Sequence, residues 1–259
     1  MKKAFLYFGL FFVLVAGMPK KTLRSLENKA FDKGETLNYR VHYGFVDAGE
    51  ATLEVLEDDV KIGGRSTLHV VGRGTSVGPF DWFFKVRDRY ESYLDEEAIL
   101  PWVFVRRVNE GGYHLERDVV FNHFQNQASI NKDKYDTPEG CQDVLSAYYF
   151  ARTQDLQNME VGEMLEINTF FDKEVYPLAI KYMGKKVIDT KIGKIRCLEF
   201  MPMLQEGRVF TDEEDMRVWI SDDNCKIPVR VQADILVGSI RMDIKSVKGL
   251  TGELAFVDE

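Results

Sequence analysis

Gly34–Glu57, GETLNYRVHYGFVDAGEATLEVLE, is the stretch that decides how the rest of the chain can fold. Apolar and polar residues alternate in it, first from Leu37 to Phe45 and again from Ala51 to Val55. A period of two is typical of a strand that buries one face. Gly44 to Gly49 lies between the two runs and supplies a turn. We therefore expect a β-hairpin that lays both apolar sets on one core.

The same alternation recurs along most of the chain. Asn109-Glu110-Gly111-Gly112 is a good tight turn between two such runs, because two glycines accept positive φ. Residues 74–82 have no clear period and are expected to be irregular. The pattern predicts further strands at 67–73, 83–94, 102–108, 113–121, 164–171, 175–183, 186–189, 194–200, 217–220, 227–235 and 239–247.

One segment has a different period. From Cys141 to Leu156 the apolar residues recur at spacings of three and four, and Asp143 can cap the start, which predicts a helix. Many short strands with a single mid-chain helix predict an all-β protein of mainly antiparallel, curved sheets, as a barrel, a half-barrel or a sandwich. A parallel α/β fold is excluded because it needs a helix between successive strands.

The start of the chain is typical of an export signal. Lys2 and Lys3 precede the apolar run Ala4–Val15, and small residues follow it. We expect a signal peptide over 1–17, a loosely held N-terminal arm over 18–31, and a β-rich domain over 32–259 that the helix at 141–156 divides into halves. The apolar run is too short to span a bilayer, so we expect no transmembrane segment after cleavage.

Composition narrows the class of partner. The 259-residue chain has a formal net charge of −8, and its lysines and arginines alternate with acids instead of clustering. Nucleic acid is therefore not expected as a partner. A chain of this length with 45% apolar residues can bury a core without disulfides. Cys141, Cys197 and Cys225 are odd in number, which favours thiols, with a Cys197–Cys225 bridge as the alternative.

No motif in the sequence gives a catalytic signature. Gly74-Thr75-Ser76-Val77-Gly78 matches the G-x-S-x-G nucleophile elbow, but we expect Pro79 and a strand from about Phe83 to leave no room for the helix that the elbow requires. We interpret it as a flexible loop and assign no catalytic residue and no cofactor.

Metal sites are also not predicted. Two acidic clusters lack the ligand order of a calcium loop. The histidines lie on separate strands without metal-ligand spacing, at His42, His69, His114 and His123, and the acidic clusters are Asp212–Asp215 and Asp222-Asp223-Asn224.

Aromatic residues are densest beside the 72–78 glycines. Core packing is the simpler reading of them, but five rings exceed what one strand face buries. If a ligand exists, we expect it to be apolar or amphipathic and to contact Phe80, Trp82, Phe83, Phe84 and Trp102.

Three stretches together resemble a family of exported Gram-negative bacterial proteins known as a domain of unknown function. They are GETLNYRVHYGFVDAGEA, DVLSAYYFAR and VWISDDNCKIPVRVQADILVGSIRMDI, and the resemblance extends from Phe31 to Ile244. It implies no activity. More distantly, a strand, acidic turn, proline, strand unit at 93–102 and 219–229 is similar to one in LolA-type periplasmic lipoprotein carriers, whose half-barrel holds acyl chains.

These observations favour an exported, periplasmic protein without enzymatic activity that binds a lipid, lipoprotein or glycan ligand or serves the envelope. Secretion from the cell or a place on the outer surface is the less favoured location. The alternative function is a carbohydrate-active hydrolase whose two carboxylates converge only in the fold, because such an enzyme leaves no local signature in sequence.

Overall fold

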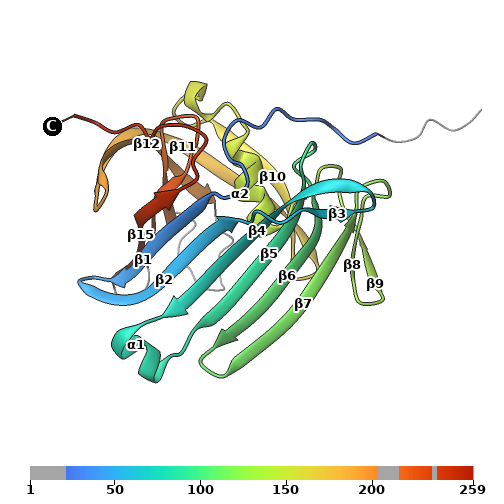
Figure 1. Cartoon of the computed structure of the whole chain (residues 1–259), viewed down its shortest axis with the longest axis horizontal. Coiled ribbons are helices and arrows are strands. Elements are labelled where there is room, and N and C mark those ends of the chain that lie inside the picture. Colours follow the sequence, from blue (N-terminus) through green and yellow to red (C-terminus); the bar gives the residue numbers. More distant parts are fainter. Residues whose placement is uncertain (1–21, 204–215, 235–237, 259) are drawn as a thin grey trace, which may run out of the picture.

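The computed structural model describes residues 22–203, 216–234 and 238–258, and within them fifteen strands form one curved, antiparallel sheet (Figure 1). The strands are β1 (Thr36–Tyr43), β2 (Val46–Val55), β3 (Val60–Ile62), β4 (Arg65–Ser76), β5 (Arg87–Asp95), β6 (Pro101–Glu110), β7 (Tyr113–Asn122), β8 (Gln127–Ile130), β9 (Asp133–Asp136), β10 (Met164–Phe171), β11 (Glu174–Thr190), β12 (Gly193–Met203), β13 (Met216–Ser221), β14 (Pro228–Asp234) and β15 (Ser239–Lys248).

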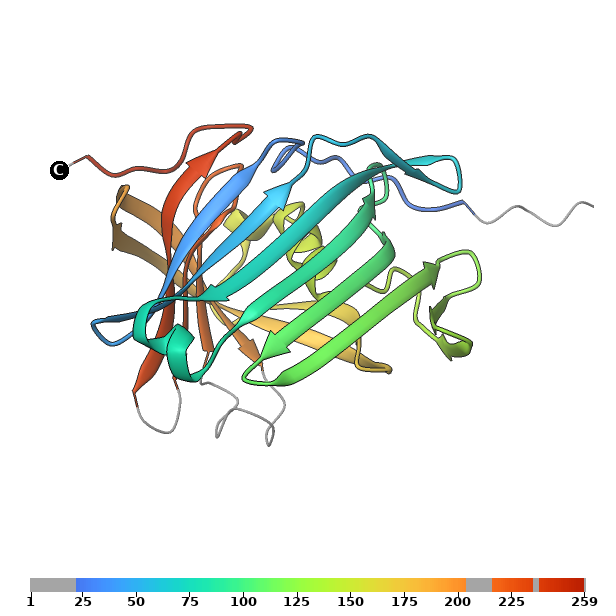
Figure 2. The same ribbon diagram turned by 60° about the horizontal axis from the view of Figure 1, so that its bottom comes forward.

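The strand order explains how the chain curls. It is β10-β11-β12-β13-β14-β15-β1-β2-β4-β5-β6-β7-β8-β9, with β3 paired only to β4. The first strand therefore lies beside the last, and the two edges of the sheet are β9 and β10, which follow one another in sequence. The fold is the open form among the predicted barrel-like architectures, and the sheet wraps around helix α2 (Val144–Arg152), as Figure 2 shows.

Side chains connect the β10 edge to β6 and β7, to which it has no backbone pairing. Phe170 of β10 packs edge-on against Phe121 of β7, with ring centroids 6.1 Å apart. Asp172, in the β10–β11 turn, accepts a hydrogen bond of 2.7 Å from Arg106 and is also paired with Arg117. The open sheet is thus held in its curled form by an apolar and an ionic contact.

The opening hairpin is confirmed as β1 and β2, with Leu37 opposite Leu53 and Tyr39 opposite Ala51. The turn is shorter than expected: Gly44, at φ +55°, and Phe45 suffice, and β2 begins at Val46. A shift in register at Val41/His42 takes up the odd residue of the return strand, so Leu53 and Ala51 stay in phase.

The expectation of an irregular segment over 74–82 was wrong. β4 continues to Ser76, the short helix α1 occupies Gly78–Phe83, and β5 starts at Arg87 instead of near Phe83. Proline does not exclude this helix, because Pro79 stands in its first turn, where a missing N–H costs nothing.

Two other differences concern strand ends. The strands predicted at 175–183 and 186–189 are one strand, β11, whose register shifts at Tyr182/Gly184 without ending it. Gly184 has a φ of +116°, so it marks a bulge and not a turn. The short strands β3, β8 and β9 were not predicted, because three or four residues are too few to show a period.

Helix α2 is confirmed but is shorter than predicted. The Asp143 carboxylate accepts hydrogen bonds from the backbone N–H groups of Leu145 and Ser146, both at 2.8 Å. The Ser146 hydroxyl in turn accepts a hydrogen bond of 2.7 Å from the Asp143 N–H, which completes a capping box. After Arg152 the chain turns into a 3₁₀ helix, η1 (Leu156–Asn158).

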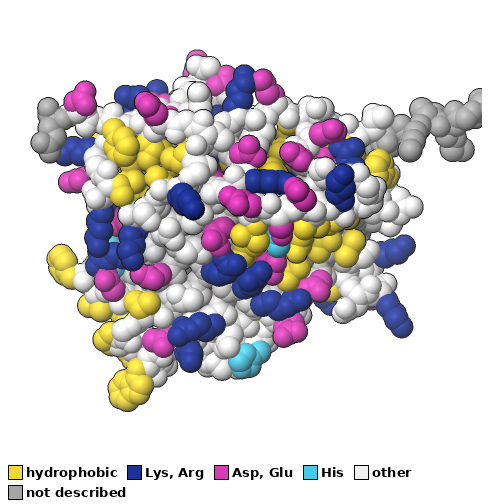
Figure 3. All heavy atoms as spheres, in the orientation of Figure 1, with side chains coloured by type: hydrophobic (Ala, Val, Ile, Leu, Met, Phe, Trp, Pro, Cys, Tyr) yellow, Lys and Arg dark blue, Asp and Glu magenta, His cyan; other side chains and the backbone are white. Residues whose placement is uncertain are grey.

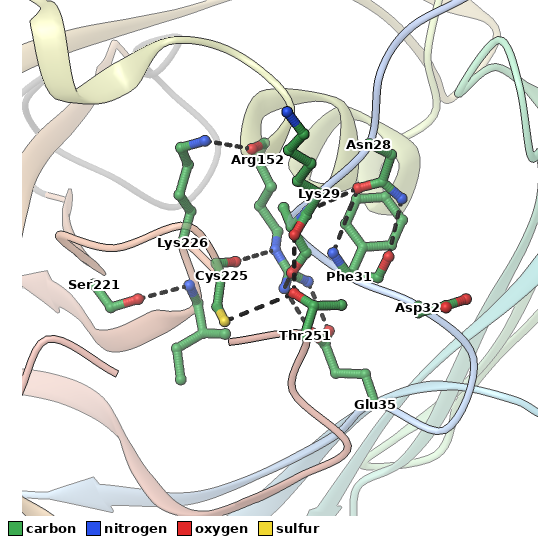
Figure 4. A network of polar contacts seen from close by, with 12 residues as sticks. Asn28, Lys29, Phe31, Asp32, Glu35, Arg152, Ser221, Cys225, Lys226 and Thr251 are labelled. Atoms are coloured by element: carbon green, nitrogen blue, oxygen red, sulfur yellow. Dashed lines mark hydrogen bonds and ion pairs between the residues drawn. The ribbon is translucent and has the colours of Figure 1, made fainter. Parts of the chain in front are cut away.

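Arg152 connects the helix to both halves of the sheet (Figure 4). Its fully buried guanidinium donates two hydrogen bonds of 2.6 Å to Glu35 and one each, at 2.9 Å, to the carbonyls of Ala30 and Cys225. Phe31 lies 4.9 Å beneath the guanidinium as a cation–π partner. All three nitrogens of the guanidinium donate hydrogen bonds, which offsets the cost of burying its charge.

The described part of the N-terminal arm is therefore not loose. Ala30 and Phe31 are each 2% exposed, and Leu26 donates a backbone hydrogen bond of 2.8 Å to Glu97. Arg24 adds a bond of 2.9 Å to the Ala98 carbonyl. Residues 22–31 are fixed along the end of the sheet that α2 fills. The expected signal peptide, 1–17, lies outside the described residues.

Candidate ligand-binding site

The inner face of the sheet, which is the face toward α2, is filled at one end and hollow at the other. The hollow end holds an open cavity of about 740 Å³ between the sheet and α1. This volume lies within the range of about 300–1,000 Å³ of small-molecule sites. The cavity is lined by Val41, Tyr43, Ala48, Gly49, Glu50, Ala51, Gly74, Thr75, Ser76, Phe80, Phe84, Val86 and Ile240.

Small residues keep this end of the sheet uncovered. Ala51 lies opposite Gly74, and Gly49 opposite Ser76, so four small residues adjoin on β2 and β4. A Cβ added to Gly74 would meet nothing within 4 Å. A Cβ added to Gly72, two residues earlier on the same face, would meet Leu53 at 3.3 Å and Leu145 of α2 at 3.5 Å. The boundary between filled and hollow therefore lies between these two glycines.

Helix α1 borders the hollow on the side away from the sheet. A polar cluster fixes the helix to the sheet: Ser76 donates a hydrogen bond of 2.7 Å to Asp81, and Arg87 donates one of 2.6 Å to the same carboxylate. The bond from Arg87, and then that from Ser76, lowers the pKa of Asp81. With its base held in this way, α1 turns Phe80 and Phe84 toward the cavity.

Ser76, the central residue of the G-x-S-x-G match, is used structurally. Its hydroxyl donates to Asp81 and accepts from the backbone N–H of Val86 at 2.8 Å. Three of the histidines are hydrogen-bonded to residues other than Ser76. His42 bonds Asp243, His69 bonds Asp58 and Glu91, and His123 bonds the Pro101 carbonyl. Helix α1 does follow the motif, but the Ser76 hydroxyl is engaged in the hydrogen bonds that fix this helix to the sheet.

The structure brings together only part of the predicted aromatic set. Phe80 and Phe84 line the cavity, whereas Trp82 is 91% exposed and Phe83 is 65% exposed. Trp102 starts β6 at the end of the sheet opposite α1, is 8% exposed, and donates a hydrogen bond of 3.0 Å to Asp95. It borders a separate cavity of about 690 Å³ that Arg24, Arg65, Glu97 and Phe124 also line.

Residues of the opening hairpin form one wall of the cavity, and the sequence pattern did not predict this. Val41, Tyr43 and Ala51 belong to the alternating set of the hairpin, and Gly74 to the glycine-rich stretch beside the aromatic residues. The period of two placed them on an inner face, but it does not say whether that face is covered.

A carboxyl pair lies on the strands next to the cavity but does not line it. The backbone of Glu110 pairs with that of Val86, a cavity residue, and Asp88 lies opposite Gly74. Burial, and then a hydrogen bond with the side chain of Asp88, raises the pKa of Glu110. The two carboxyls contact one another, whereas a glycosidase holds its pair about 5–10 Å apart with the sugar between them. The hydrolase alternative stays a prediction.

The predicted acidic cluster at Asp222 and Asp223 takes part in holding the fold together. Asp223 accepts hydrogen bonds from the backbone of Cys225 and Lys226, and Asp222 from Lys185 and Arg196, so this acidic turn is structural. The cluster at 212–215 lies outside the described residues. Within the described ranges no group of three His, Cys, Asp or Glu residues is placed to hold a metal.

The three cysteines are buried free thiols, as favoured over the bridge. Burial raises the pKa of Cys141 and of Cys197 to about 12, so both remain protonated and unreactive at neutral pH. Among the residues that the structure describes, no helix has the length and apolar character needed to span a bilayer.

Comparison with solved structures supports the fold. A β-barrel-like protein of domain of unknown function DUF1849 from Brucella abortus has a TM-score of 0.54 at 9% identity, covering 88% of this chain and 99% of that chain. A candidate lipoprotein from Parabacteroides distasonis has a TM-score of 0.37 at 9% identity (88% and 100% covered). A candidate exported protein with a YmcC-like fold from Bacteroides fragilis has 0.32 at 9% identity (87% and 99% covered).

Only the first of these likenesses is close enough to carry an argument, and it concerns the open, barrel-like sheet. No curated protein matches the chain in sequence. The family described as protein of unknown function (DUF3108) matches residues 38–245, which is most of the chain and nearly the extent of the resemblance seen in the sequence. The chain therefore belongs to the DUF3108 family of proteins of unknown function.

Proposed function

We propose that the protein binds one apolar or amphipathic ligand in the α1 cavity and holds it out of water without changing it chemically. The observation that carries the proposal is the uncovered inner face at Ala51 and Gly74, where an added Cβ would meet nothing within 4 Å. An apolar hollow of about 740 Å³ is costly to leave open unless something fills it.

A single acyl chain suits the site better than a compact polar molecule such as a glycan. The walls carry aliphatic and aromatic side chains. The carboxylate of Glu50, the one charged residue of the lining, is hydrogen-bonded to Lys245 at 2.7 Å. The likeness of short sequence units to LolA-type carriers of acylated proteins agrees with this class of ligand.

We place this activity in the periplasm. The basic start and the apolar run over 4–15 support export, and the negative net charge of −8 suits a free envelope protein. In this setting the protein would carry or sequester a lipid or the acyl group of a lipoprotein between membranes.

The experiment is a titration with a fluorescent long-chain fatty acid. The wild type should bind saturably with one site, and affinity should rise with chain length by about 0.8 kcal/mol per buried CH₂ until the cavity is full. Gly74→Leu places a side chain in the hollow without a backbone clash and should weaken binding at least tenfold. Ser66→Leu, on an exposed position of the same strand, is the control and should bind as the wild type does. Absence of saturable binding in the wild type, or equal binding by Gly74→Leu, would refute the proposal.

A further inference from the structure

The end of the molecule that holds the cavity also carries the three most exposed aromatic side chains among the described residues. Phe45 in the β1–β2 turn is 103% exposed, Trp82 91% and Phe83 65%, and Phe84 next to them is 50% exposed. We call these four residues the aromatic rim. Figure 3 shows apolar side chains protruding from the end of the molecule where the β1–β2 turn and α1 lie in Figure 1.

The fold does not explain the two most exposed of these rings, Phe45 and Trp82. Phe45 occupies a two-residue turn that any polar residue could fill, and its full exposure leaves it without packing partners. Helix α1 has six residues and no buried side chain, yet it presents Trp82 and Phe83 to water. Single exposed hydrophobic residues are common, but a set of large rings on neighbouring projections marks an interaction site.

The rim flanks the cavity on two sides. Ala48, three residues after Phe45, and Phe84 of the rim both line the cavity, and the backbone N–H of Val77 donates a hydrogen bond of 3.0 Å to the Ala48 carbonyl. The turn and the helix are therefore joined at their bases while their rings project. Whatever contacts the rim lies next to the cavity.

Charge at the rim is nearly balanced. Arg40 pairs with Asp47, and Arg87 pairs with Asp81 at 2.6 Å, so among the described residues around the rim the exposed Lys85 is the cation outside an ion pair. The chain as a whole has a net charge of −8, which would repel a strongly anionic surface. The rim therefore fits an uncharged or zwitterionic surface.

We propose that the aromatic rim docks on the surface of a zwitterionic phospholipid bilayer, with its rings among the headgroups and the cavity beside the membrane. Separate protruding rings suit a bilayer, which deforms around each one, whereas a protein partner would need a matching hollow for each. Trp and Phe are the side chains that favour the boundary between headgroups and acyl chains. This surface is additional to the proposed ligand site and does not depend on it.

Flotation with phosphatidylcholine vesicles tests the proposal. The wild type should float with the vesicles, and adding anionic lipid should weaken the association. The double variant Phe45→Ser with Trp82→Ser should bind vesicles at least tenfold more weakly. Phe124→Ser, which changes an aromatic residue 46% exposed beside Trp102 at the other end of the sheet, is the control and should float normally.

Tryptophan fluorescence locates the contact. Trp102 and Trp219 are 8% and 7% exposed, so Trp82 is the tryptophan that brominated lipid can quench. Trp82→Phe should keep flotation and lose the quenching. The proposal is overturned if the wild type does not float, if the double variant floats like the wild type, or if quenching persists in Trp82→Phe. The double variant leaves the cavity walls unchanged, so its fatty-acid affinity should remain within twofold of the wild type, which separates this result from that of the ligand site.

Discussion

The two ends of the inner face belong to the same sheet, but a different helix lies over each end. At one end α2 lies on β4 and β5, with Leu145 against Gly72 and the capping carboxylate of Asp143 accepting a hydrogen bond of 2.6 Å from Ser92. At the other end α1 stands off the sheet and leaves a cavity of about 740 Å³ above Gly74. Two residues along β4, from Gly72 to Gly74, separate a packed core from a hollow.

This difference shows that the hollow is not a general looseness of the fold. The filled end contains fully buried Arg152, Tyr149 and Tyr39, and its charged groups are paired. A chain that packs one end so completely could pack the other with a larger residue at Gly74, where space is open. The predictions below disturb first the filled end and then the boundary.

The largest effect is expected from Glu35→Ala. The change leaves the guanidinium of Arg152 buried without its carboxylate, so it should lower the free energy of unfolding by about 5 kcal/mol. Urea unfolding measures this. Glu27→Ala, which removes a carboxylate from an exposed pair with Lys29, is the control and should cost less than about 0.5 kcal/mol. Similar losses in the two variants would contradict the anchoring role of Arg152.

Two tryptophans from the predicted aromatic set should behave in opposite ways. Trp102→Ala removes a buried ring and its hydrogen bond to Asp95, and should cost about 3–4 kcal/mol of unfolding free energy. Trp82→Ala removes an exposed ring and should change stability by less than about 0.5 kcal/mol. Thermal unfolding of both variants decides this, and a strongly destabilised Trp82→Ala would mean that α1 packs more closely than described.

Asp143 should make stability depend on pH. Burial raises the pKa of Asp143 to about 6, above its usual 3.8. The folded state then binds more protons than the unfolded state between these values, so the contribution of Asp143 to stability falls as the pH rises from about 4 to 6. Asp143→Asn removes this dependence.

The stability difference between Asp143→Asn and the wild type should therefore shift in favour of the variant by about 3 kcal/mol over that window. Unfolding curves at a series of pH values measure the shift. A constant difference would show that the carboxyl is ionised throughout.

The smallest effect compares the two glycines at the boundary. Gly74→Ala adds a methyl group to open space and reduces the freedom of the unfolded chain, so it should stabilise by about 0.5 kcal/mol. Gly72→Ala brings a methyl group within 3.3 Å of Leu53 and should give no gain or a small loss. If Gly72→Ala stabilises as much as Gly74→Ala, the two ends do not differ in packing as described.

Sequence patterns predicted most of the strands and the helix because these are local properties. The alternation from Leu37 to Val55 depends on neighbours in the chain, and the cap at Asp143 on residues within one helical turn. The short helix α1 was missed because the first-turn position of Pro79 looks the same in sequence as a loop proline.

The site was only partly predictable because it depends on pairing between distant residues. Gly74 becomes part of a cavity wall only when Ala51 lies opposite it and α2 stops short of it. Trp102 was grouped with Phe80 and Phe84 by their nearness in sequence, but β5 carries the chain to the other end of the sheet before Trp102 begins β6. Aromatic density in a sequence therefore does not show which rings share a pocket.

Photoaffinity labelling tests most directly whether the hollow end is the ligand site. A fatty acid with a diazirine near the end of its chain would be bound, irradiated and mapped by peptide mass spectrometry. The ligand-site proposal predicts labels in 41–51 and 74–86, from the hairpin and α1 walls, and strong loss of label in Gly74→Leu. Labels concentrated at 22–25 and 97–102, around the cavity beside Trp102, or spread evenly over the outer face of the sheet, would contradict it.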